Sequence, residues 1–152
     1  MPRAARQTKH CEWAIPRFLF MGLMLLLSPI IVHAAFTAPD RLPGITPVDA
    51  EQFITLIQQE TVVVIDSRLA VDRNQGHIEN SVGLLDTATD CDSLATLAPK
   101  VVTTLLFYCN GVKCPRSSRA ATIAQACGYK RVFWLRGGFD EWKQKKYPYL
   151  RK

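Results

Sequence analysis

The feature that most restricts the fold of this chain is a continuous series of strand, loop and helix patterns between residues 101 and 127. Leu105–Tyr108 is a short apolar run typical of a buried strand, and Cys109 follows at its end. A polar loop over residues 110–116 comes next. Ser117–Cys127 contains good helix formers with apolar residues at helical spacing, and Gly128 supplies a stop. The stretch predicts a thiol at the end of a strand, facing the loop that opens a helix.

This position favours an ionised sulfur. The unpaired N–H groups of such a loop and the partial positive charge at a helix N-terminus both stabilise anions. The thiolate is the reactive form of cysteine, and Lys113 and Arg116 add positive charge nearby. We therefore expect the sulfur of Cys109 to be exposed in a bowl of amide hydrogens and to act as the catalytic nucleophile. The residues expected to bind the substrate are Asn110, Gly111, Val112, Lys113, Cys114 and Arg116.

Strand and helix patterns alternate through the rest of the chain. Such alternation predicts an α/β domain with three layers, α/β/α, around a central parallel sheet. Ligands of these sheets bind beyond the carboxyl ends of the strands, where Cys109 is expected. The other expected elements are a helix from Pro47 capped by Thr46, a strand over Thr61–Ile65, a strand over Ser81–Leu85, a helix over residues 90–97 capped by Asp90 or Asp92, a strand over Arg131–Leu135 and a helix over Phe139–Lys145.

The N-terminus has the layout of a secretory signal peptide. Residues 1–17 are polar and basic, and Phe18–Val32 is almost wholly apolar but shorter than the roughly 20 residues of a membrane span. We expect cleavage after Ala34 and a periplasmic or otherwise exported protein. The alternative is an uncleaved anchor over residues 18–35, in which case the protein is held at a membrane. Residues 35–44 are then a linker, residues 45–148 one domain and residues 149–152 a basic tail.

Charge and metal-ligand patterns exclude two classes of partner. The chain carries 19 Lys and Arg against 13 Asp and Glu, a net charge of +6. Four of these cations and one acid lie in residues 1–34, so the remainder has 15 against 12, or +3. The basic C-terminus lacks interleaved aromatic residues, so we expect no nucleic-acid binding. No CxxC motif occurs, and His33 and His77 are not spaced with the cysteines, so no metal and no cofactor is expected.

Several motifs occur in an order that resembles the rhodanese-like sulfurtransferases. They are IDSR, GHIENSV, LLFYCNG, RSSRAA and GYKRVFWLRGGFDEW, and together they span about residues 45–148. The resemblance implies a three-layer α/β fold with the catalytic cysteine, Cys109, opening the loop after the central strand. It also implies the partners: a small anionic sulfur donor such as thiosulfate, and a thiol or other nucleophilic acceptor. Cys109 would hold the sulfane sulfur between them as a persulfide.

The loop departs from the family pattern. From Cys109 to Arg116 it is about two residues longer than the usual rhodanese loop, and loop length decides which anion fits the amide groups. The extension contains Cys114, which could be a resolving thiol, a disulfide partner of Cys109 or a residue without a role. Cys109 itself could be a small buried hydrophobe. Cys91 and Cys127 also remain after export, and the sequence does not fix any pairing.

Three functions therefore remain open. The first is an exported sulfurtransferase that uses a Cys109 persulfide. The second is a dithiol redox protein that uses Cys109 and Cys114. The third is a non-catalytic module of this fold that binds an exported protein partner or an anion. A phosphatase or an arsenate reductase of related fold is disfavoured by the length of the loop.

Overall fold

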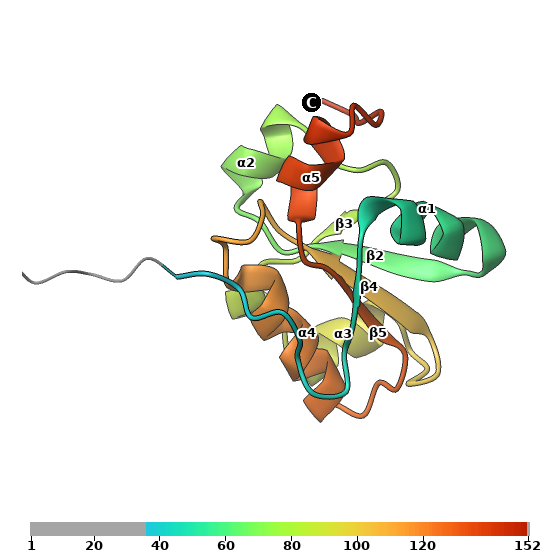
Figure 1. Cartoon of the computed structure of the whole chain (residues 1–152). Coiled ribbons are helices and arrows are strands. Elements are labelled where there is room, and N and C mark those ends of the chain that lie inside the picture. Colours follow the sequence, from blue (N-terminus) through green and yellow to red (C-terminus); the bar gives the residue numbers. More distant parts are fainter. Residues whose placement is uncertain (1–35, 152) are drawn as a thin grey trace, which may run out of the picture. The chain divides into compact units, whose positions relative to one another are not determined.

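The computed structural model describes residues 36–151 of the chain. The predicted signal peptide or anchor lies outside the described residues, and no helix within residues 36–151 is long and apolar enough to cross a bilayer. Five parallel strands form one sheet in the order β1-β5-β4-β2-β3 (Figure 1). The strands are β1 (Thr46–Val48), β2 (Val62–Asp66), β3 (Val82–Gly83), β4 (Thr104–Tyr108) and β5 (Val132–Leu135). The helices are α1 (Ala50–Gln59), α2 (Ala70–Gln75), α3 (Cys91–Leu97), α4 (Arg116–Ala126) and α5 (Gly138–Gln144), with a 3-10 turn η1 (Asp86–Ala88).

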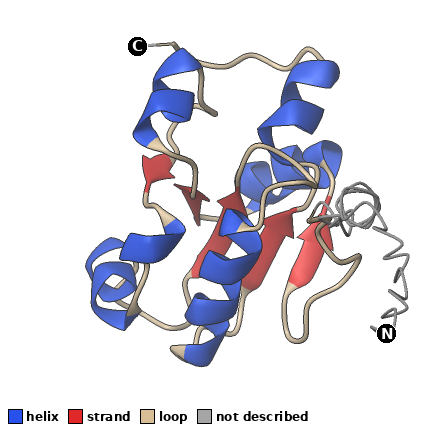
Figure 2. Cartoon of the chain, turned by 90° about the vertical axis from the view of Figure 1, so that its left-hand side faces the viewer, coloured by secondary structure: helices blue, strands red, loops and turns tan. Residues whose placement is uncertain are grey.

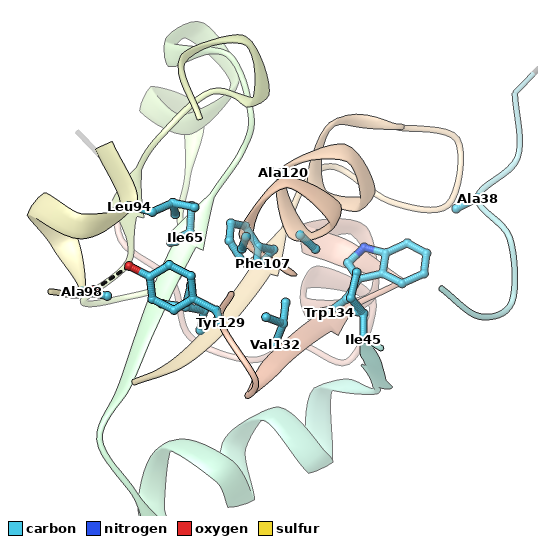
Figure 3. Packing of buried hydrophobic residues seen from close by; sticks show 13 residues of the cluster. Ala38, Ile45, Ile65, Leu94, Ala98, Phe107, Ala120, Tyr129, Val132 and Trp134 are labelled. Carbon is cyan, nitrogen blue, oxygen red and sulfur yellow. Dashed lines mark hydrogen bonds between the residues drawn. The ribbon is translucent and has the colours of Figure 1, made fainter. Parts of the chain in front are cut away.

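Helices cover both faces of the sheet, as Figure 2 shows. Strand β4 is buried along its whole length, and its side chains alternate between two hydrophobic clusters. Leu105 and Phe107 pack with α3 and α4 in the cluster drawn in Figure 3, whereas Leu106 and Tyr108 pack with α1 and α5. The predicted three-layer α/β/α fold is confirmed. Because β4 is central, its last residue delivers the next one, Cys109, to the middle of the sheet edge.

The start of the domain differs from the prediction. Thr46–Val48 forms β1 instead of the first turn of a helix, since it pairs with β5 in the register Thr46↔Phe133 and Val48↔Leu135. Helix α1 therefore begins at Ala50, and its cap is Asp49, which exchanges hydrogen bonds with Gln52 in a capping box. The expected cap at Thr46 and the helical position of Pro47 are wrong. At α3 the prediction is confirmed, with Asp90 as the cap.

Both ends of the described chain pack on the domain. In the predicted linker, Ala38 is buried, and its N–H group donates to the carbonyl oxygen of Val112 in the loop after β4. At the other end, Leu150 pairs with His77 through two backbone hydrogen bonds. The described parts of both segments are therefore attached to the domain surface.

A disulfide joins Cys91 at the start of α3 to Cys127 at the end of α4. Its two cysteines are 36 positions apart, and their Cα atoms are 5.4 Å apart. Closing a loop of this length in the unfolded chain stabilises the fold by about 4 kcal/mol in the chain-entropy view. Within residues 36–151, the other two cysteines, Cys109 and Cys114, are free thiols.

Candidate functional site

The loop after β4 folds over its first residue. Cys109 is only 1 % exposed, and its Sγ lies 3.0 Å from Ser117 Oγ and 3.1 Å from the carbonyl oxygen of Cys114. The expectation that this sulfur is exposed in a bowl of amides is wrong. The physical reason is that the far end of the loop folds back onto the strand end, where the Cys114 carbonyl oxygen and the Ser117 hydroxyl lie against the sulfur.

The predicted substrate-binding residues do come together. A cavity of about 720 Å³ opens over the loop, and its other wall comes from the turn before α5 and from α5 itself. Cys114 lines this cavity, whereas Cys109 does not. The lining residues are Asn110, Gly111, Val112, Lys113, Cys114, Pro115, Arg116, Gly137, Asp140, Glu141 and Gln144. The predicted residues therefore line one cavity, and its wall includes Cys114, a thiol with 8 % of its surface exposed, and not Cys109.

Cys114 occupies the anion-stabilising position that was expected for Cys109. A hydrogen bond from the Cys109 thiol lowers the pKa of Cys114 to about 5, against an opposing effect of partial burial. The backbone N–H groups of Arg116 and Asn110 act in the same direction. The Arg116 guanidinium, whose Nη1 lies 3.7 Å from the sulfur, adds positive charge. These contacts favour the thiolate of Cys114, the nucleophilic form of cysteine.

Cys109 is the protonated member of the pair. The interaction with Cys114, followed by burial, raises the pKa of the Cys109 thiol far above its ordinary value. Trp134 Nε1 donates to Ser117 Oγ at 3.0 Å, and the Ser117 hydroxyl donates to Cys109 Sγ at the same distance. These bonds form one directed chain in which the Trp134 indole donates to Ser117, the Ser117 hydroxyl to Cys109 Sγ, and the Cys109 thiol to the carbonyl oxygen of Cys114 at 3.1 Å. The chain ties the buried thiol to the backbone of the residue that lines the cavity.

The N-terminal turn of α5 fixes the beginning of the loop. The N–H groups of Phe139 and Asp140 donate to the carbonyl oxygens of Cys109 and Asn110 at 2.8 and 2.7 Å. Gly138 has φ +60°, and a Cβ atom there would overlap the Cys109 carbonyl oxygen. The contact of Gly138 with Cys109 was not predicted from the sequence, and neither were the roles of Ser117 and Trp134. The only sequence signal for them was their place in the family motifs.

The charges around the cavity are mixed. Arg116 also lies 3.9 Å from a carboxylate oxygen of Asp86, and Arg119 pairs with the same carboxylate at 3.4 Å, outside the cavity lining. Of these two arginines, Arg116 lines the cavity and Arg119 does not. Asp140 and Glu141 face the two cations of the loop from the α5 side. In residues 36–151, no cluster of three His, Cys, Asp or Glu side chains is arranged to ligate a metal.

Two other polar residues singled out by the motifs are structural. Asp66 lies under the sheet edge, fully buried, and forms an ion pair with Arg68 at 2.7 Å. The Tyr108 hydroxyl donates to the same carboxylate at 2.7 Å. These bonds tie the ends of β2 and β4 together and place no free group in the cavity.

Two free thiols, Cys109 and Cys114, lie in the loop that follows the central strand of a three-layer parallel α/β domain, at the edge where such sheets bind their ligands. The sequence matches the profile of the rhodanese-like domain family over residues 49–145, which is more than half of the chain. The protein belongs to the rhodanese-like domain family. The resemblance seen in the motifs is thereby confirmed.

Known relatives share both sequence and fold. The chain is 27% identical over 134 residues to the uncharacterized protein YibN of Escherichia coli K12, a match that covers 88% of this chain and 90% of that protein. The BH2092 protein of Bacillus halodurans has a similar structure, with a TM-score of 0.61 and 23% identity over 70% of this chain and 77% of that one. A thiosulfate sulfurtransferase of Pseudomonas aeruginosa has a TM-score of 0.57 and 19% identity, and the match covers 70% of this chain and 20% of that one. A rhodanese of Escherichia coli solved with anions has a TM-score of 0.51 and 22% identity, and the match covers 60% of this chain and 100% of that one. At these identities the structures establish the fold alone.

Proposed function

We propose that this protein is a sulfurtransferase that carries a sulfane sulfur as a persulfide on the loop after β4. The donor is a small sulfur compound such as thiosulfate, and the acceptor is a thiol or another nucleophile. The sequence assigned the persulfide to Cys109, but the contacts favour Cys114. The observation that carries this proposal is that Cys114 combines a stabilised thiolate with a place in the wall of the cavity.

The transfer has two steps, and the same groups support both. In the first, the Cys114 thiolate attacks the sulfane sulfur of the donor, the donor S–S bond breaks, and sulfite leaves with the electron pair when the donor is thiosulfate. In the second, the acceptor attacks the outer sulfur of the persulfide and the Cys114 thiolate departs. The amide groups of Asn110 and Arg116 hold the negative charge before and after each step. A thiol of lowered pKa is also the better leaving group.

The identity of the donor is an open part of the proposal. Lys113 and Arg116 favour an anion in the cavity, whereas Asp140 and Glu141 disfavour a dianion. A donor panel that includes thiosulfate and a low-molecular-mass persulfide therefore belongs in the first experiment.

Export to the periplasm or another extracytoplasmic space is part of the proposal. Two observations support it: the signal-like layout of residues 1–34 and the Cys91–Cys127 disulfide, a bond that persists in oxidising compartments. In the alternative, residues 18–35 anchor the domain to a membrane. Fractionation of cells that express the full chain separates the two, because an anchored protein stays with the membrane pellet after a high-salt wash. A chain that keeps residues 1–34 and stays with the cytosolic fraction contradicts export.

The test compares single replacements of the two thiols. Each variant is incubated with a donor and with cyanide as acceptor, and thiocyanate is measured. Cys114→Ser is expected to abolish transfer, whereas Cys109→Ser retains it because Cys109 does not touch the cavity. Transfer that survives in Cys114→Ser and disappears in Cys109→Ser would return the persulfide to Cys109. Absence of transfer in the wild-type protein with every donor would favour the non-catalytic binding module.

A further inference from the structure

The second thiol of the site has no task in a single-cysteine transfer, although it is placed directly behind the first. Cys109 and Cys114 are separated by four residues, and the carbonyl oxygen of Cys114 lies 3.1 Å from Cys109 Sγ. The Ser117 hydroxyl holds that sulfur from the other side at 3.0 Å. Cys109 is almost inaccessible to solvent, since it is 1 % exposed. The only reactive neighbour of this buried thiol in the described chain is therefore Cys114.

A persulfide on Cys114 would be open to attack from two different directions. The outer sulfur extends into the cavity, where a small acceptor can reach it. On the protein side of Cys114 lies the buried Cys109 thiol, whose Sγ is 3.1 Å from the Cys114 carbonyl oxygen. An external nucleophile therefore meets the outer sulfur, and Cys109 meets the inner one.

We propose that Cys109 is a resolving thiol that attacks the inner sulfur of the Cys114 persulfide, forms a Cys109–Cys114 disulfide and releases the outer sulfur as hydrogen sulfide. This inference rests on the proposed sulfurtransferase function. It gives the protein a second outcome for the same intermediate: transfer of the sulfur when an acceptor occupies the cavity, and release as sulfide when none does.

The atoms and electrons of the release step balance within the site. The Cys109–Cys114 S–S bond forms, the S–S bond of the persulfide breaks, and the outer sulfur leaves with the electron pair. The proton of the Cys109 thiol leaves with it as HS⁻. The sulfane sulfur is reduced to sulfide, and the two cysteine sulfurs are oxidised to the disulfide. An external dithiol then reduces the disulfide, which returns both thiols for another cycle.

Ser117 and Trp134 act as positioning residues for this step. While Cys109 is a thiol, their hydrogen-bonded chain fixes the orientation of its sulfur at 3.0 Å from the Ser117 hydroxyl. While Cys109 attacks, the same hydroxyl stabilises the charge that develops on the sulfur. Cys91 and Cys127 take no part, because they are already joined to each other.

The experiment follows one turnover in the absence of an acceptor. The reduced full-length protein, with the Cys91–Cys127 bond intact, receives an equimolar amount of a low-molecular-mass persulfide under anaerobic conditions. Released sulfide, free thiols and the intact mass are then recorded. The expected result is one sulfide per protein, the loss of two thiols, and a protein mass lower than that of the reduced form by two hydrogens.

Two variants separate this inference from the function on which it rests. Cys109→Ser, with Cys109→Ala as a second replacement in case the first disturbs packing, is expected to keep the added sulfur on Cys114 and to release no sulfide. Because the variant also loses the Cys109 contact that lowers the pKa of Cys114, its transfer to cyanide is measured over a series of pH values and is expected to move to higher pH without being abolished. A wild-type protein that keeps the persulfide and never forms the disulfide overturns the resolving role and leaves the transfer function intact. A wild-type protein that neither gains sulfur nor releases sulfide overturns both. Disulfide formation without any sulfur transfer to cyanide would instead identify a dithiol redox protein.

Discussion

The pH dependence of Cys114 alkylation gives a quantitative prediction for the site. The thiolate of Cys114 depends first on the hydrogen bond from Cys109 and then on the loop amides and Arg116. Replacing Cys109 by alanine removes the largest of these contributions without touching the cavity wall. We expect the pKa of Cys114 to rise toward its ordinary value of 9.0 in that variant.

The size of the effect lies in the pH profile and not in the rate at neutral pH. Lowering the pKa from 9.0 to about 5 raises the thiolate fraction at about pH 7 roughly 100-fold. Over the same interval the intrinsic nucleophilicity of the thiolate falls by a factor of roughly 40 to 100. The two factors nearly cancel, so the wild-type rate at neutral pH resembles that of an ordinary thiol. Its profile differs, because the rate stays flat down to about pH 6 and falls only near pH 5.

The assay measures the alkylation rate with a small neutral reagent over a series of pH values, with Cys114→Ser as the blank. Cys109 contributes little label in the native protein because its side chain is buried. For Cys109→Ala we expect the midpoint of the profile to move upward by more than one pH unit. A wild-type midpoint above about pH 8, or a midpoint that is the same in Cys109→Ala, would refute the assignment of the negative charge to Cys114.

Three further results follow from named contacts. Replacing Cys91 and Cys127 together by serine removes about 4 kcal/mol of stability and lowers the melting temperature by more than about 10 °C. An unchanged melting curve would show that the Cys91–Cys127 disulfide is not formed in the protein. Gly138→Ala destabilises the fold by more than about 1 kcal/mol in urea denaturation, because the alanine would have φ +60° and its Cβ atom would overlap the Cys109 carbonyl oxygen. An unchanged free energy of unfolding would contradict that packing. Arg116→Ala slows persulfide formation from thiosulfate at least several-fold. The control Arg119→Ala does not, because Arg116 lines the cavity and Arg119 lies outside its lining. Equal rates of persulfide formation in the two variants would remove Arg116 from the site.

The central strand, the loop and the following helix could be predicted from the sequence because the patterns that define them are local. The apolar run of β4, the polar loop and the alanine-rich helix α4 each depend on neighbouring residues. The start of the domain was predicted wrongly for the opposite reason. Thr46–Val48 is a strand only because β5 lies beside it, and that pairing joins residues far apart in the chain. Helix α2 was missed because it is short and polar and lacks a side-chain cap.

The exchange of roles that we propose for the two thiols also could not be predicted. Cys109 follows an apolar strand in the sequence position of the family nucleophile. Whether its sulfur faces solvent depends on how a lengthened loop folds back and on the contact with Gly138 from the next helix. Neither is a local property of the sequence. The loop side of the cavity wall was predicted as a group because its residues are nearly consecutive, whereas the α5 side was not predicted.

The most direct test of the persulfide site uses the trypsin cleavage positions inside the loop. Lys113 lies between the two thiols, so cleavage there and at Arg116 places Cys109 and Cys114 on separate peptides. The protein is loaded with donor, trapped at once with an alkylating reagent, digested and analysed by mass. To prevent release of the sulfur, the Cys109→Ser variant is analysed beside the wild type. We predict an added sulfur on the Cys114–Arg116 peptide of the Cys109→Ser variant. In the wild type we predict either the same added sulfur or, where release has already occurred, a Cys109–Cys114 disulfide that joins the two peptides. An added sulfur on the Cys109 peptide of the wild type, and none on the Cys114 peptide, would contradict this prediction.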